Sequence, residues 1–333
     1  MAALIVAPRP RVLCRSVAGL FTRCSALRYS GARRGSAAFK SRAVKVGVPP
    51  AAKCYSESAS GSATGPGLEL LVHYLEASES AGIVVFGINR PQSKNAISKN
   101  LVEMMTAAIE EVKCDKNVRA VILRSEVPGI FCAGADLKER AKMQPSEVGP
   151  FVSKARRLIN ELGNLPMPTI AALDGTALGG GLEMALACDI RVAATSAKMG
   201  LVETKLAIIP GAGGTQRLPR IVGVSLAKEL IFSGRLLDGT EAKVVRLVSH
   251  VVEQNEAGDA AYHRALSLAK EFIPQGPIAV RLAKLAINQG IEVDLKTGLA
   301  IEEACYAQVI PTKDRIEGLN AFKEKRLPRY TGE

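Results

Sequence analysis

Apolar and polar positions between about residues 68 and 258 alternate in a way that predicts short buried strands separated by amphipathic helices. The apolar runs are brief and bounded by turn residues, which is typical of buried strands; they are Ile83–Asn89, Val118–Arg124, Pro168–Leu173 and Ile190–Ala194. Helices are predicted between them, beginning at Ser98, which can cap a helix, around Ser146 to Leu162, and at Gly180 or Gly181. Because strands and helices take turns, we expect βαβ units and a mostly parallel sheet.

The pattern changes after about Gly258, where strand signals stop. Helical periodicity continues in the segments Ala260–Phe272, Pro277–Gln289, Leu295–Gln308 and Thr312–Glu324. The apolar faces of these helices can either cover the sheet of the same chain or pack against a neighbouring subunit. No apolar run reaches the roughly 18 residues that a membrane span needs, so we expect none.

The positive charge of the chain is concentrated at its beginning. The formal net charge is +12, but residues 1–56 hold eleven Arg and Lys and no acidic residue, which leaves 33 basic against 32 acidic residues in the remainder. An Arg-rich, Ala- and Ser-rich segment without acids is typical of a mitochondrial transit peptide, and we predict one, with its linker, over residues 1–61. A basic tail that binds polyanions is the alternative.

Cysteine and histidine do not form a metal-binding pattern. None of the seven cysteines has CxxC spacing, and the three histidines are far apart in the sequence, so no metal site is expected. Beyond the basic segment we expect reduced, buried thiols; they are Cys114, Cys132, Cys188 and Cys305.

Two glutamates stand in otherwise apolar, glycine-marked segments. Glu183 ends the run Ala-Leu-Gly-Gly-Gly-Leu-Glu, and Glu203 ends Met-Gly-Leu-Val-Glu. Taken singly, each has an ordinary reading: Glu183 as a carboxylate near a helix N-terminus, and Glu203 as a solvated loop residue or a partner of Lys205. Buried carboxylates are costly unless they do chemistry, however.

Two glycine-containing turns accompany these glutamates. The three glycines before Glu183 precede a helix, whose first N–H groups are unsatisfied, and the turn Phe131–Asp136 can also aim amides at a ligand oxygen. A glycine run alone is better explained by close helix-to-strand packing. Together, the glutamates and turns predict acid/base chemistry beside an oxyanion hole.

Four segments resemble the enoyl-CoA hydratase (crotonase) superfamily, in the order and spacing of that family. They are Phe131–Lys138, Ala177–Ala185, Cys188–Arg191 and Gly200–Leu218. The resemblance implies an α/β fold, the crotonase (ClpP-like) spiral of ββα/βαβ units, with a core domain over residues 68–256. It also implies a helical region over residues 257–333 that serves oligomerisation, as a trimer or a dimer of trimers.

The same resemblance implies roles for individual residues. The amides of Ala135 and Gly180 would form the oxyanion hole for the thioester oxygen. Glu183 and Glu203 occupy both acid/base positions of the hydratases, which favours water addition over isomerisation or dehalogenation. We assign removal of the water proton to Glu183 and protonation of C2 to Glu203, although coupled carboxyl groups titrate as a pair and the reverse assignment stays open.

Coenzyme A binding is also inferred from the resemblance. The channel would be lined by Ala135, Asp136, Leu137, Lys138 and Gly180, and a neighbouring subunit would add a contact near Phe322 or Lys325. Coenzyme A is part of the substrate, and neither a metal nor a redox cofactor is required.

Further segments resemble superfamily members that hydrate 3-methylglutaconyl-CoA to 3-hydroxy-3-methylglutaryl-CoA in leucine degradation, in the mitochondrial matrix. They are Val127–Phe131, Glu139–Met143, Ala304–Gln308 and Pro328–Tyr330. That reaction is our expectation by resemblance alone, because no residue that pairs with the distal carboxylate can be identified. The alternatives are a general short-chain enoyl-CoA hydratase, or chiefly an RNA-binding protein with vestigial hydratase activity.

AU-rich RNA is a second partner that the resemblance implies. In the RNA-binding relative, lysines spaced four apart along one helix face are associated with this activity. This chain keeps Lys99 and also has Lys113, but Glu103 and Ala107 replace the intervening lysines, and the helix has no aromatic residue for base stacking. These residues favour an ordinary amphipathic surface helix.

Overall fold

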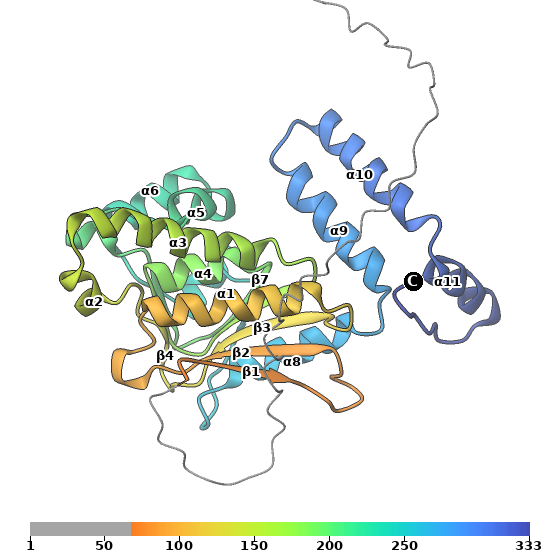
Figure 1. Ribbon diagram of the computed structural model, residues 1–333, viewed down its shortest axis with the longest axis horizontal. Helices are drawn as coiled ribbons and strands as arrows, with labels where there is room; N and C mark the ends of the chain where they lie inside the picture. Colours follow the sequence, from red (N-terminus) through yellow and green to blue (C-terminus); the bar gives the residue numbers. More distant parts are fainter. Residues whose placement is uncertain (1–67) are drawn as a thin grey trace, which may run out of the picture. The chain divides into compact units, whose positions relative to one another are not determined.

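The computed structural model describes residues 68–333 (Figure 1). The predicted transit peptide and linker, residues 1–61, lie outside the described residues.

A six-stranded sheet forms the centre of the fold, in the order β1-β2-β3-β5-β7-β10. Its strands are β1 (Leu70–Tyr74), β2 (Ile83–Ile88), β3 (Ala120–Ser125), β5 (Thr169–Leu173), β7 (Ile190–Ala194) and β10 (His250–Val252). All neighbours pair in parallel except β1 and β2, which are antiparallel. The expectation of a mostly parallel sheet is therefore confirmed, and four of its strands lie where the apolar runs predicted them.

A second, four-stranded sheet, in the order β4-β6-β8-β9, was not predicted. Its strands are β4 (Ile130–Cys132), β6 (Thr176–Leu178), β8 (Lys198–Gly200) and β9 (Leu237–Asp238). Strands of two or three residues are too short to give a periodic signal. This small sheet nevertheless carries the glycine-marked segments that precede both candidate glutamates.

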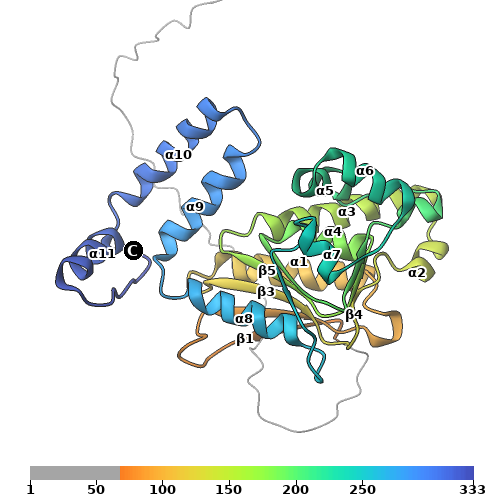
Figure 2. The same cartoon turned by 180° about the vertical axis from the view of Figure 1, so that it is seen from behind.

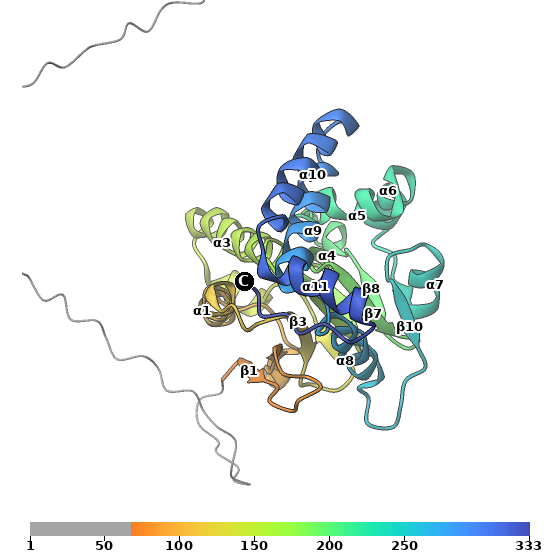
Figure 3. The same cartoon turned by 90° about the vertical axis from the view of Figure 1, so that its right-hand side faces the viewer.

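Helices cover both faces of the large sheet (Figures 1 and 2). The helices up to β10 are α1 (Lys99–Cys114), α2 (Leu137–Lys142), α3 (Pro145–Gly163), α4 (Gly180–Ala187), α5 (Gly214–Val222), α6 (Val224–Ser233) and α7 (Gly239–Val244), with 3-10 turns η1 (Pro91–Ser93) and η2 (Glu203–Leu206). Those that follow are α8 (Ala260–Phe272), α9 (Pro277–Gly290), α10 (Leu295–Val309) and α11 (Lys313–Glu324). Figure 3 places α1 and α3 on one side of the sheet and α8 on the other.

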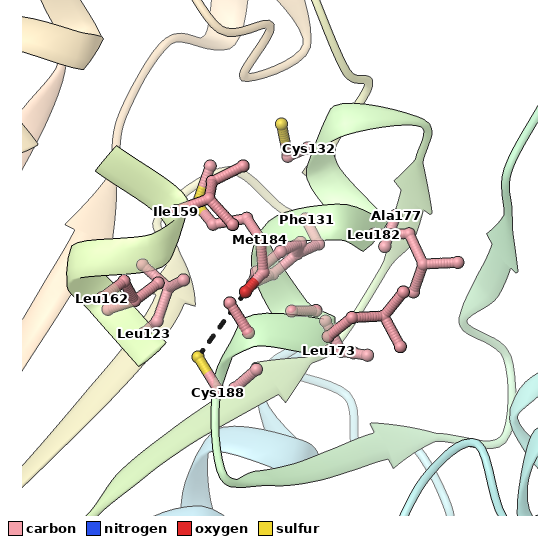
Figure 4. Close-up of a cluster of buried hydrophobic side chains, with 14 of the residues drawn as sticks. Leu123, Phe131, Cys132, Ile159, Leu162, Leu173, Ala177, Leu182, Met184 and Cys188 are labelled. Atoms are coloured by element: carbon pink, nitrogen blue, oxygen red, sulfur yellow. Dashed lines mark hydrogen bonds between the residues drawn. The ribbon is translucent and has the colours of Figure 1, made fainter. Parts of the chain in front are cut away.

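Alternate residues of each strand enter different cores. In β2, Val84 and Phe86 pack with α1, α3 and α4, whereas Ile83 and Val85 pack with α8. This two-residue period explains why the strand is buried throughout, because both faces of a helix-covered parallel sheet are apolar. Figure 4 shows part of the larger core, where Met184 and Leu182 of α4 lie among side chains of α3 and the neighbouring strands.

The predicted helix boundaries are largely confirmed. Ser98 is the N-cap of α1, where its side chain accepts a 2.8 Å hydrogen bond from the amide of Leu101. The C-terminal helices α8 to α11 begin and end within about one residue of the segments that periodicity indicated. No helix among residues 68–333 is long and apolar enough to cross a bilayer.

Helix α9 is attached to the core by buried charge. Lys284 is nearly buried and pairs with Asp189 at 2.7 Å, and its ammonium also donates to the carbonyl of Met167 at 2.9 Å. Helix α10 then packs along α9. Large apolar side chains stay exposed on these helices, at the end of α9 and on α11, among them Ile287, Ile291, Leu295 and Phe322.

The cysteines of the described part are all free thiols. Cys132, Cys188 and Cys305 are buried, as expected, but Cys114 is exposed at the end of α1, so the expectation of burial is wrong for that residue. Cys114 lies beside the exposed Lys113 on the polar side of the last turn, whereas Val112 of the same turn is buried.

Candidate active site

Glu183 is a buried carboxylate in the first turn of α4, with 3% of its surface exposed. Its Oε1 accepts two backbone hydrogen bonds, from the amide of Ala212 at 2.8 Å and from that of Gly214 at 2.7 Å. Burial raises the pKa of Glu183, whereas these two amides and the cations of Arg217 and Arg156 act to lower it. The carboxylate is thus fixed in place and its ionised form is partly compensated.

Glu203 is buried in different surroundings, at the start of the 3-10 turn η2. Its residue is 9% exposed, and within the described chain its Oε2 has no hydrogen-bond partner. Burial raises the pKa of Glu203 to about 7, and the negative charge of Glu183 contributes in the same direction. Glu203 is therefore not a solvated loop residue, because it is buried. The Lys205 side chain does not turn toward it either but extends along Gly234, where an added Cβ would lie 2.8 Å from Cε of Lys205.

The small sheet brings the two glutamates to the same place. A Cβ added at Gly179, just before α4, would lie 3.1 Å from Oε1 of Glu203. A Cβ added at Gly214 would lie 3.0 Å from Oε1 of Glu183. Glu183 is the fourth residue of α4. Both glutamates therefore lie near the N-terminus of α4, close enough for the charge of Glu183 to raise the pKa of Glu203.

The amides of Ala135 and Gly180 also lie side by side. A Cβ added at Gly180 would lie 3.8 Å from the Ala135 nitrogen, and one added at Gly134 would lie 3.4 Å from the Gly180 nitrogen. Gly134 has φ +92°, a conformation that glycine adopts without strain. In residues 68–333 neither amide donates a hydrogen bond to another residue.

A parallel bridge explains why the Ala135 amide is available. Ile97 donates to the carbonyl of Gly134 at 2.7 Å and accepts from the amide of Asp136 at 3.1 Å. These two bonds flank Ala135, whose own N–H then points away from Ile97. The Gly180 amide is available for another reason, since the first N–H groups of a helix have no intrahelical acceptor.

The proposed coenzyme A segment contains one residue with a structural task. Asp136 is 8% exposed, caps α2 by accepting from the amides of Lys138 and Glu139, and pairs with Arg90 at 3.1 Å. Leu137 is 53% exposed and Lys138 is exposed too, so these two side chains are available to a ligand.

The lysines considered for RNA binding are engaged in surface ion pairs. Lys113 pairs with Glu161 at 2.9 Å, and Lys99 lies 3.9 Å from Glu147. Glu103, which interrupts the lysine spacing, pairs with Lys154 at 2.9 Å. The exposed side of α1 is therefore a surface of mixed charge.

Residues 78–333 match the Enoyl-CoA hydratase/isomerase family model. The chain belongs to this family. It is 74% identical over 265 residues to "Methylglutaconyl-CoA hydratase, mitochondrial" of Homo sapiens, covering 80% of this chain and 78% of that protein. It is 56% identical over 279 residues to "Enoyl-CoA hydratase domain-containing protein 2, mitochondrial" of Homo sapiens, covering 84% and 94%.

Solved structures agree with the fold. The crystal structure of an enoyl-CoA hydratase from Bacillus anthracis matches with a TM-score of 0.76 at 48% identity, covering 80% of this chain and all of that one. The Pseudomonas aeruginosa protein DspI matches with a TM-score of 0.74 at 32% identity, and the match covers 82% of this chain and all of the DspI chain. The expected family and the crotonase fold with a C-terminal helical region are therefore confirmed.

Sequence reasoning missed the residues that hold the family site in shape. The donors to Glu183 come from the loop before α5 and from Gly214, the first residue of that helix, and Arg90 connects Glu69, at 2.7 Å, with Asp136. Arg90 also donates to the carbonyl of Ala96. Ala96 precedes Ile97, whose two backbone hydrogen bonds flank Ala135. The only signal in the sequence was a charged residue beside a proline, which predicts a turn and nothing more.

Proposed function

We propose that this protein is a hydratase that adds water across the double bond of 3-methylglutaconyl-CoA, giving 3-hydroxy-3-methylglutaryl-CoA. The observation that carries the proposal is the buried carboxylate of Glu203, whose Oε2 has no hydrogen-bond partner within the described residues, beside the amide-bound carboxylate of Glu183. An unsatisfied buried carboxyl group is costly, and such groups are typical of acid/base sites. The 74% identity to a relative named methylglutaconyl-CoA hydratase supports the substrate.

The different surroundings of the glutamates suggest which proton each one carries. Glu183 receives two N–H donors and lies near cations, which favours a carboxylate that accepts the proton of the attacking water. Glu203 has a pKa raised to about 7 by burial, so it can hold a proton at neutral pH and deliver it to C2. Water would add to C3 as its proton passes to Glu183.

The paired amides supply the electrostatic part of the mechanism. As water attacks, negative charge develops on the thioester oxygen, and donors fixed beforehand stabilise the enolate-like transition state more than the ground state. The amides of Ala135 and Gly180 are suitable donors because they are adjacent and carry no other hydrogen bond within the described residues. Losing one such donor typically costs about 100- to 1,000-fold in rate.

The relatives and the basic N-terminal segment support a substrate class and a location. Leu137 and Lys138 are exposed beside the amides, where coenzyme A would extend. The basic segment at residues 1–56 and the mitochondrial names of the relatives support the mitochondrion, and we propose the matrix and leucine degradation.

Self-association through the C-terminal helices is part of the proposal. Phe322 of α11 is 87% exposed, and apolar residues of α9 and α10 are exposed with it. Apolar faces of this kind are usually covered by a partner, and we propose a trimer or a dimer of trimers in which Phe322 or Lys325 approaches a neighbour's coenzyme A. No observation favours RNA as a second ligand, because the α1 lysines are paired with carboxylates.

A kinetic comparison tests the proposal. Hydration should be faster, in kcat/KM, on 3-methylglutaconyl-CoA than on crotonyl-CoA; the reverse order would favour a general enoyl-CoA hydratase. Glu183→Gln should lower kcat about 100- to 10,000-fold while KM for the thioester changes little. Turnover close to that of the unmodified protein in this variant would refute the assigned chemistry.

A further inference from the structure

The loop that holds Glu183 rests on one face of α3. A Cβ added at Gly211 would lie 2.9 Å from Cγ1 of Val152, and Nε of Arg156 donates to the carbonyl of Gly211 at 2.7 Å. Val152, Arg156 and Asn160 are four residues apart, so they share one side of the helix. The loop is thus supported by one side of α3.

Arg217 connects this loop to α3. Its Nη2 donates to Oδ1 of Asn160 at 2.7 Å, and its Nη1 donates to the carbonyl of Ala212 at 3.2 Å. The amide of Ala212 donates to Glu183, so this residue is held on both sides. Gly213 has φ +112°, and a Cβ there would lie 2.1 Å from Nη1 of Arg217, so a side chain at this position would displace the guanidinium.

We propose that Arg217, seated on Asn160 of α3, is a positioning residue for hydration: it fixes the Ala212 and Gly214 amides on Glu183 and places positive charge beside that carboxylate. The inference deepens the proposed function and rests on it. Arginine suits the task because its planar guanidinium donates in two directions at once and stays charged.

The charged groups that act on Glu183 or are coupled to it lie on three neighbouring elements. They are Arg217 of α5 and Arg156 of α3, which act to lower its pKa, and Glu203 of η2, which is coupled to it as a like charge. Removing the Arg217 cation should raise the pKa of Glu183. Because a general base must be deprotonated, the acid limb of the pH profile of kcat/KM should then move to higher pH.

Four variants of the full chain separate position from charge. Arg217→Gln removes both and should lower kcat about 10- to 100-fold, since a misplacement of about 1 Å can cost about 100-fold, and should shift the acid limb upward. Arg217→Lys keeps the charge but not the two-directional contact, so kcat should fall while the acid limb stays. Asn160→Ala removes only the support and should behave like Arg217→Lys. Arg220→Gln, an exposed residue of the same helix, is the matched control and should change neither.

The outcomes distinguish a failure of this inference from a failure of the proposed function. If the unmodified protein hydrates no enoyl-CoA, the proposed function fails. If the unmodified protein is active and Arg217→Gln keeps the same kcat and the same acid limb of the pH profile, the inference fails. It also fails if Arg217→Gln only loses thermal stability while the acid limb stays in place. Should Arg217→Gln not fold, an unchanged kcat in both Arg217→Lys and Asn160→Ala would overturn it equally.

Discussion

Glu203 should make the folded protein less stable at alkaline pH, because its burial favours the protonated form. The pKa rises from an ordinary 4.5 to about 7 in the folded state. Below pH 4.5 the group is protonated in both states, and between 4.5 and about 7 only the folded state keeps the proton. The free energy of unfolding therefore falls as the pH rises through this window.

The size of this effect follows from the shift. One pKa unit corresponds to about 1.36 kcal/mol, so the full loss above pH 7 is roughly 3 kcal/mol. Glu203→Gln lacks the titration, and it keeps a neutral side chain of nearly the same shape. We expect it to be more stable than the unmodified protein by up to roughly 3 kcal/mol at pH 8, and almost equal to it at pH 4.5. Hydration should be largely lost, as expected where stability is given up for function.

Urea unfolding at fixed protein concentration, at pH 4.5 and pH 8, measures the difference. Glu256→Gln, at an exposed loop carboxylate, controls for the loss of one negative charge. A variant that gains no stability at pH 8, or gains the same amount at both pH values, would show that Glu203 is not a buried group of raised pKa. Stabilisation with full activity retained would separate the residue from catalysis.

Three further predictions concern the surroundings of the site. Gly134→Ala should lower kcat about 100-fold or more with the fold preserved, since an added Cβ would lie 2.9 Å from the Leu178 carbonyl at φ +92° and displace the adjacent amide; unchanged kcat would contradict this role. Arg90→Ala leaves Asp136 and Glu69 without their cation and should cost about 3 kcal/mol or more in urea unfolding, whereas a loss below 1 kcal/mol would indicate a solvated network. In a gel shift with an AU-rich strand, the full chain should bind more tightly than a chain starting at Ser62, and salt should weaken that binding steeply; equal binding by both would place an RNA surface in the folded part.

Sequence and structure agree where the signal is long and repetitive. Helices α8 to α11 each repeat their apolar face over several turns, and their ends were predicted closely. The buried strands of the large sheet were found for the same reason. Strands such as β9, with only two residues, carry no period of their own and exist because neighbouring strands pair with them.

The candidate site residues could be identified from the sequence, whereas the residues that hold them in position could not. Glu183 and Glu203 stand out because charge in an apolar segment is unusual, and the glycines mark the turns. The Ala212 amide lies 29 residues from Glu183, and its donation depends on how the loop before α5 packs on α3. The pairing of Arg90 with Asp136, 46 residues away, likewise has no local pattern to reveal it.

The distribution of thiols has a practical consequence for following this protein in solution. Cys132 and Cys188 are buried and their pKa is raised to about 12, so both stay protonated and unreactive, and Cys305 is buried as well. Within residues 68–333, Cys114 alone is exposed. A maleimide fluorophore on that part of the chain would therefore mark one point, the end of α1, and could report assembly by energy transfer while the reaction centre remains unlabelled.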